Sequence, residues 1–283
     1  MKIGIVGVID MVTMDNFDSS SFDIYDINLV QKEVGGGVIS FEQIDTIRDF
    51  PDSKSIIISG LKQDTFEYFV NTYGKQFQAI TFWKNKGVSD LSALSLLSDV
   101  EYISYFFNQK ASKLWDMTNN KKLIGLSLTD FSKLHSLEGI EKASSLEYFD
   151  IGNQVESRME IESFKPIVNT NIRHFAWSGK KVQDSDFGCL AKSKIEELDI
   201  CPLRFTMLEL AQLLALFPET LKGTITKPYT KGGIKDKDGY TEYFFLCKRK
   251  KTCVKGRDDE RFASYLNEFE RILKECRKNK EKL

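Results

Sequence analysis

The chain has 283 residues, and 40 lysines and arginines nearly balance 41 aspartates and glutamates, which gives a formal net charge of −1. Hydrophobic residues make up 41% of it, enough to bury a sizeable core. A nearly neutral composition argues against a general nucleic-acid binder. The five cysteines have no C-x-x-C spacing, so we expect reduced thiols in a cytoplasmic protein and no disulfide framework.

The first residues contain one lysine ahead of an apolar stretch, which Gly4, Gly7, Asp10 and Asp15 interrupt. This stretch provides neither a secretory leader nor the roughly 20 apolar residues of a membrane span. Gly4 and Gly7 match part of a nucleotide-binding glycine turn, but the third glycine and a following helix are missing. A structural strand is therefore favoured, and a nucleotide-binding enzyme is the weaker alternative.

We predict an N-terminal cap over residues 1–51. Its β-rich stretches, residues 2–12, 22–30 and 37–41, are separated by Asn, Asp, Ser and Gly clusters typical of turns. The stacked part of the fold should then begin with a strand at residues 55–58.

A helix is predicted directly after that first strand. Phe66, Phe69 and Tyr73 recur at helical spacing and would cover the convex side of the fold.

From Phe77 onward, a hydrophobic phrase returns at nearly constant spacing. Successive copies open at Phe77, Val100, Leu123, Leu146, Ile172, Ile195 and Leu221, in steps of 23, 23, 23, 26, 23 and 26 residues. The first six copies also carry apolar residues at their fourth and sixth places, which is the alternation of a strand with one buried face. The period predicts an α/β solenoid over residues 52–226, with about 7 to 8 stacked repeats and a parallel sheet on the concave side.

The chain resembles the leucine-rich repeat family, and most closely its irregular bacterial forms such as the internalins. The best copy covers residues 77–97, where Asn85 follows the strand at the family's asparagine position. Asn108 matches it in the next copy, whereas later copies place Phe131, Gln154, Lys180 and Leu203 there. The resemblance implies a horseshoe in which these asparagines bond backbone groups of the turn behind the strand.

Strand positions that point away from the core form the concave face, where solenoids usually bind their partners. The predicted partner-binding residues are Trp83, Tyr102, Phe106, Tyr148, Asp150, His174, Glu197 and Asp199. Aromatic side chains give large contact areas with few rotors, and the carboxylates favour a partner with a basic surface. The alternative is that these aromatic rings pack against the caps or against each other.

Residues 227–283 are predicted to form a C-terminal cap. A polar, glycine-rich connection between residues 221–226 and 240–247 suggests a hairpin. Asp258 and Asp259 can then cap a helix. Its apolar face would comprise Phe262, Tyr265, Leu266, Phe269, Ile272, Leu273 and Cys276.

Other chemistry receives little support from the sequence. His135 and His174 lie in distant copies, and Cys247 and Cys253 are outside the usual zinc-ligand spacing, so we predict no catalytic residue, metal or cofactor. Residues 247–283 hold 13 lysines and arginines against 7 acids, and the basic run 248–251 makes nucleic-acid binding an alternative.

The favoured interpretation is a cytoplasmic, non-enzymatic protein-binding module. Small bacterial proteins with this resemblance include effectors and intracellular inhibitors such as toxin-immunity partners.

Overall fold

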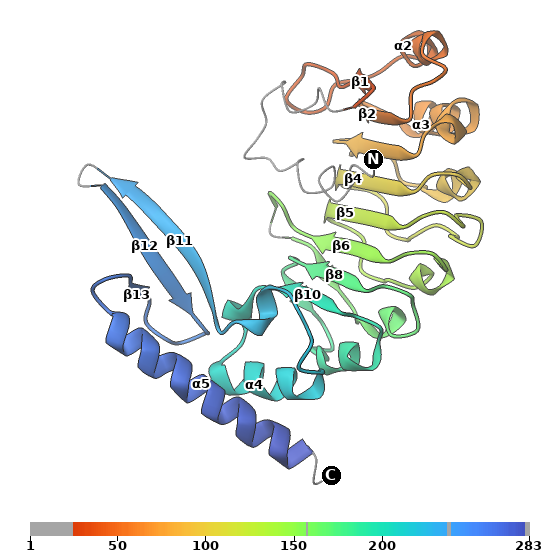
Figure 1. The fold of residues 1–283 in the computed structure, drawn as a ribbon. Coiled ribbons are helices and arrows are strands. Elements are labelled where there is room, and N and C mark those ends of the chain that lie inside the picture. Colours follow the sequence, from red (N-terminus) through yellow and green to blue (C-terminus); the bar gives the residue numbers. More distant parts are fainter. Residues whose placement is uncertain (1–24, 157, 237–238, 281–283) are drawn as a thin grey trace. The chain divides into compact units, whose positions relative to one another are not determined.

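The computed structural model describes residues 25–156, 158–236 and 239–280 (Figure 1). The chain divides into two compact units, Met1–Lys194 and Ile195–Leu283, which are described separately below. The domain limits predicted at residues 51 and 226 remain predictions.

The first unit is built on a parallel sheet whose strands follow one another in chain order. They are β1 (Ile27–Leu29), β2 (Ser55–Ser59), β3 (Ala79–Trp83), β4 (Tyr102–Asn108), β5 (Gly125–Phe131), β6 (Tyr148–Gly152) and β8 (His174–Trp177). Equivalent repeat positions pair directly, as Ile80 pairs with Ile103 and Ile103 with Leu126. This register confirms the predicted solenoid, because each repeat adds one strand beside the last.

The stack begins one strand earlier than predicted. β1 pairs in parallel with β2, so the chain segment assigned to a separate cap already contributes a strand to the sheet.

The return segments of the first unit are short and mostly 3₁₀. They contain α2 (Phe41–Asp45), α3 (Gln63–Thr72), η3 (Thr46–Asp49), η4 (Gly74–Gln76), η5 (Ser92–Leu96), η6 (Ile140–Lys142), η7 (Lys165–Ile167) and η8 (Gly188–Lys192), and the strand pair β7 (Glu160–Ile161) with β9 (Lys181–Val182). Figure 1 shows α2 and α3 on the side of the strand layer opposite its concave face. The helix predicted after the first strand is therefore confirmed as α3.

The prediction of a β-rich stretch at residues 37–41 is wrong at its C-terminal end, where a helix begins. Ser40 caps α2, since the Gln43 amide donates to the Ser40 hydroxyl at 3.3 Å and the Ser40 amide donates to the Gln43 side chain at 2.9 Å. This reciprocal capping box starts a helix at Phe41.

The core of the first unit lies between the strands and the return segments. The fourth and sixth places of each copy are buried, and neighbouring rings continue from repeat to repeat, with the Phe82 and Tyr105 rings 5.1 Å apart. Asn85 and Asn108 are fully buried behind the strands. Asn85 donates to the Ile58 carbonyl and accepts from the Leu61 amide, as the resemblance implied.

The second unit combines a single strand, a hairpin and two helices. Its elements are β10 (Glu197–Ile200), η9 (Pro202–Arg204), α4 (Met207–Leu216), η10 (Thr224–Thr226), β11 (Tyr229–Asp236), β12 (Gly239–Leu246), β13 (Cys253–Val254) and α5 (Asp259–Lys280). β11 and β12 form the predicted antiparallel hairpin, and β13 pairs with the other side of β12.

The first hairpin strand lies later than predicted. Residues 221–226 instead continue the repeat, because Lys222 forms a parallel bridge with Glu197, and η10 follows. α4 was not predicted, although its start is visible in the sequence as the capping box of Thr206 and Glu209.

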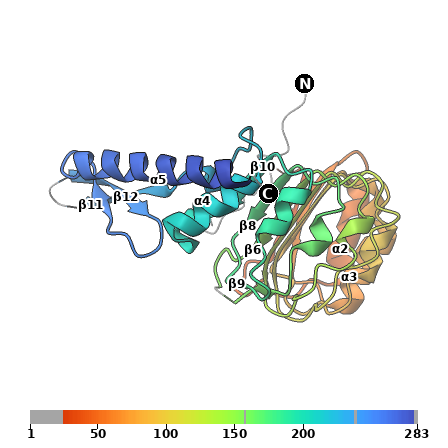
Figure 2. The same ribbon diagram turned by 90° about the horizontal axis from the view of Figure 1, so that it is seen from below.

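The predicted C-terminal helix is confirmed as α5. Tyr265 and Phe269 are buried, and the Phe262 ring stacks on Phe244 of β12 at 4.1 Å. Figure 2 shows α5 lying along the hairpin strands and beside α4. Within the described ranges, no helix combines the length and apolar character needed to cross a membrane.

Candidate functional site

The concave face of the first unit is not uniformly exposed. Trp83 and Phe106, both predicted to be exposed partner contacts, have 1% and 2% of their surface accessible. Their rings lie 4.4 Å apart in a buried cluster with Tyr25 and Ile57. The expectation of exposure is therefore wrong for these two residues, and the alternative of rings packing against each other and against an N-terminal segment holds for them.

Tyr25 packs in this buried cluster and is also linked to β3 by a hydrogen bond. Its hydroxyl and the Thr81 hydroxyl are 2.8 Å apart, and burial raises the pKa of the tyrosine to about 12. Since Tyr25 precedes β1, a segment far away in the sequence covers the concave positions of β3 and β4.

Partly exposed aromatic residues occupy the first strand position in the later repeats. Tyr102, Tyr148 and His174, on β4, β6 and β8, form what we call the aromatic strip. The Tyr148 and His174 rings stack at 4.3 Å with an interplanar angle of 13°. Between β4 and β6, β5 contributes Gly125, which has no side chain to separate the two tyrosines.

Acidic side chains lie close to the aromatic strip. The pKa of Tyr102 is raised, first by burial and then by the charge of Glu101, with smaller effects from Tyr148 and Glu147. In the next column, the Ser127 hydroxyl donates to the Asp150 carboxylate at 3.0 Å. The strip thus combines flat aromatic surface with neighbouring negative charge, and partner binding by Tyr102, Tyr148, Asp150 and His174 stays a prediction.

The other two predicted residues belong to the second unit. Glu197 and Asp199 line an open hollow of about 730 Å³ beside the start of β11. Asp199 accepts a hydrogen bond from the Thr224 amide at 2.8 Å, and Lys222, Lys227 and Lys231 also line the hollow. Grouping these carboxylates with the aromatic strip stays a prediction.

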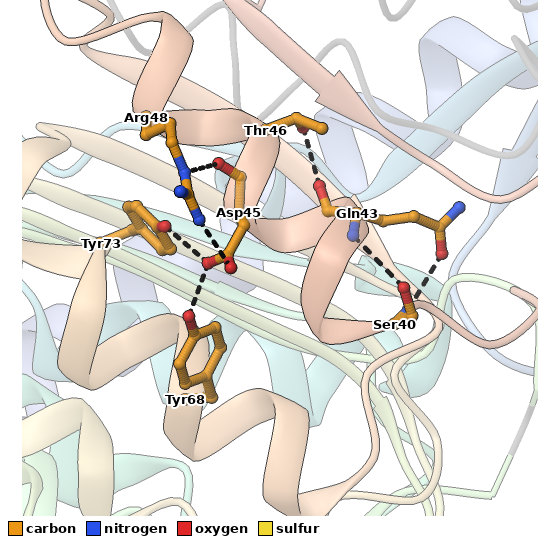
Figure 3. Close-up of polar contacts among 7 residues, drawn as sticks. All are labelled: Ser40, Gln43, Asp45, Thr46, Arg48, Tyr68 and Tyr73. Atoms are coloured by element: carbon orange, nitrogen blue, oxygen red, sulfur yellow. Dashed lines mark hydrogen bonds and ion pairs between the residues drawn. The ribbon is translucent and has the colours of Figure 1, made fainter.

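A polar cluster on the helical side of the first unit was not predicted. The Asp45 carboxylate accepts hydrogen bonds from the hydroxyls of Tyr68 and Tyr73 at 2.5 and 2.6 Å, and pairs with Arg48 at 2.7 Å (Figure 3). These hydrogen bonds lower the pKa of Asp45 and raise the pKa of Tyr68 to about 12. Because its partners satisfy the carboxylate, the cluster is structural: it joins α2 to α3.

The remaining candidates offer little organised chemistry. His135 Nδ1 lies 2.7 Å from the Glu160 carbonyl oxygen. In the basic run, Lys250 pairs with Glu268 at 3.8 Å, and the Lys248 amide donates to the Phe205 carbonyl. Over the described part of the chain, no three His, Cys, Asp or Glu side chains gather as a metal site would require. The predicted glycine turn at Gly4 and Gly7 lies outside the described residues.

Comparisons with known proteins do not assign the chain to a family. No family model matches the chain, and a search of curated proteins finds no match. A solved structure of an internalin from Listeria monocytogenes is similar over 70% of this chain and 54% of its own, with 13% identity and a TM-score of 0.48. The chain thus matches about half the length of that protein.

The chain has a leucine-rich-repeat-like fold. This description depends on the geometry of the chain itself: parallel strands pair in register at steps of 23 to 26 residues, and buried asparagines lie at the end of β4 and just after β3.

Proposed function

We propose that this protein is a non-enzymatic binding module that holds another protein on the aromatic strip. The observation that supports this most directly is the partial exposure of Tyr102, Tyr148 and His174 on a sheet face whose other end is sealed by its own chain. Contiguous apolar surface that stays exposed to water often marks a protein-interaction site.

The strip is suited to a partner with a basic surface. Tyr148 and His174 are already stacked, so little side-chain entropy is lost when a partner covers them. An arginine of the partner could stack on these rings while it pairs with Asp150 or Glu147, which combines cation–π attraction with a charge-assisted hydrogen bond. The first unit would then contribute the binding energy through a few aromatic anchors surrounded by acids.

We expect a cytoplasmic location from the cysteine pattern. An inhibitor, immunity or effector role is what the resemblance to leucine-rich repeat proteins suggests. Nucleic-acid binding through residues 248–251 is the alternative.

The proposal can be tested by quantitative affinity capture from the native host lysate, with and without nuclease. The purified chain would be compared with the double variant Tyr102→Ala/Tyr148→Ala. Phe50→Ala is the matched control, because Phe50 is an exposed aromatic residue at the end of η3, away from the strip. We expect one partner protein to be captured by the wild type and the control and to be lost with the double variant.

Equal capture by all three proteins would contradict the placement of the site. Material that disappears only after nuclease treatment, and whose binding falls steeply with salt, would support the nucleic-acid alternative instead.

A further inference from the structure

The edge of the hairpin sheet in the second unit is open along β11. The three-stranded sheet has the order β11–β12–β13, so β11 is a terminal strand. The opposite side of β12 is paired with β13, and beyond β13 the Lys255 amide donates to the Glu242 carbonyl at 3.0 Å while the two side chains form an ion pair at 3.1 Å. Within the described residues, no strand pairs with the free side of β11.

The register shows which backbone groups face this edge. The Cys247 amide donates to the Pro228 carbonyl at 3.2 Å, which continues the β11–β12 register by one pair. Hydrogen-bonded and non-hydrogen-bonded pairs alternate along an antiparallel ladder. The even-numbered residues of β11 therefore bond to β12. The backbone N–H and C=O groups that point to the open edge belong to Tyr229, Lys231, Gly233 and Lys235.

Side chains on the two faces of this edge differ in character. Lys231 and Lys235 lie on the face that carries Tyr240, Glu242 and Phe244, where Glu242 is already paired with Lys255. The opposite face carries Ile234, which is 56% exposed, and Phe245, which is 37% exposed. A long, exposed edge with apolar residues is a template for strand pairing. Two lysines on one face restrict which strand can pair with it.

We propose that β11 is a docking edge for an extended segment of another protein, which pairs antiparallel to it and carries acidic residues alternating with apolar ones. Acidic side chains opposite Lys231 and Lys235 would match their charge, and apolar side chains on the other face would extend the surface of Ile234 and Phe245. The hollow that Tyr229 lines lies at the first residues of β11. It leaves room for the bound segment to extend beyond the strand.

The same charges disfavour a second copy of this chain as the occupant. Symmetric antiparallel pairing of two β11 strands keeps equivalent side chains on one face, so four lysines would gather there. In the register centred on Gly233, Lys231 would lie directly opposite Lys235 of the copy, and like charges facing each other destabilise a sheet.

The test uses the full-length, isotope-labelled protein and a defined peptide, acetyl-Thr-Glu-Val-Glu-Val-Glu-Thr-amide. In the proposed arrangement the glutamate amides point toward β11 and the valine amides point away. A peptide N-methylated at the glutamates should therefore lose binding, whereas one N-methylated at the valines should keep it. On binding, NMR hydrogen exchange should slow at the amides of Lys231, Gly233 and Lys235.

Substitutions in the protein test the same β11 edge independently of the changes in the peptide. Lys231→Pro removes an amide that faces the edge without removing a bond to β12, and Lys231→Ala is the matched control that keeps this amide. We expect Lys231→Pro to weaken peptide binding by roughly tenfold and Lys231→Ala by a few-fold.

Three results would overturn the proposal: no binding at ~1 mM peptide, equal binding of the two methylated peptides, or unchanged exchange at the three amides. Protection of these amides that grows with protein concentration alone would show that a second copy occupies the edge, and would also overturn it.

Discussion

The asparagines behind the strands should be among the most important polar residues for stability. Asn108 is fully buried. Its Nδ2 donates to the carbonyls of Val88 and Asn85 at 2.8 and 3.3 Å. Its Oδ1 accepts from the amides of Lys110 and Ala111 at 2.9 and 2.8 Å. One side chain therefore satisfies backbone groups in two successive repeats.

The substitution Asn108→Ala would leave these groups without their partner. Lys110 is exposed, so water can replace its bond, and the Asn85 carbonyl also accepts from the Tyr105 hydroxyl. The Val88 carbonyl and the Ala111 amide are in buried residues. Each buried group left unsatisfied costs about 1–3 kcal/mol, so we expect a loss of ~4 kcal/mol in the free energy of unfolding. That is a large part of the 5–15 kcal/mol typical of a folded domain.

Urea unfolding followed by circular dichroism would measure this loss. Asn171→Ala is the matched control, because Asn171 is exposed and its Nδ2 donates to a single carbonyl, that of Ser144, at 2.6 Å. We expect the control to lose less than about 1 kcal/mol. If the two variants agree within about 0.5 kcal/mol, the buried asparagine does not hold the repeats together as argued.

Three further predictions concern separate parts of the first unit. Gly152→Ala should destabilise by about 2 kcal/mol or more in thermal melts, because Gly152 has a φ of +153° and a Cβ there would lie 2.3 Å from the Ser178 hydroxyl. Trp83→Ala should cost about 3–5 kcal/mol in urea unfolding, since the ring is buried; a loss below about 1 kcal/mol would mean that it is exposed after all. Absorbance at 295 nm should show Tyr68 titrating at a pKa of about 12, and Asp45→Ala should return it toward 10. Because the folded-state pKa of Tyr68 is raised, the stability from this contact is present below pH 10 and is lost as the pH rises through about 12.

The difference between the predicted and observed concave face has a simple cause. Trp83 and Phe106 alternate with core residues, so their strand position correctly placed them on the face away from the core. Whether that face is exposed to solvent depends on which other residues cover it. Tyr25 covers Trp83 and Phe106, and it lies more than fifty residues away in the chain. Tyr102 and Tyr148 obey the same alternation and remain partly exposed.

Two helices that were not predicted, α2 and α4, have recognisable start signals in the sequence. The capping boxes at Ser40 and Thr206 mark the starts of α2 and α4. The limits of β11 were harder to predict, because Gly232 and Gly233 have low strand propensity and the strand is defined by its pairing with β12.

By itself, the sequence determined the repeat period, the register of the core and the position of the asparagines, because each of these depends on the spacing of neighbouring residues along one strand and its turn. Only the tertiary structure decided that Trp83 and Phe106 are covered, that Asp45 joins two helices and that one edge of the hairpin stays open. These features depend on contacts between segments that are far apart in the chain, and the local periodicity of the residues does not predict such contacts.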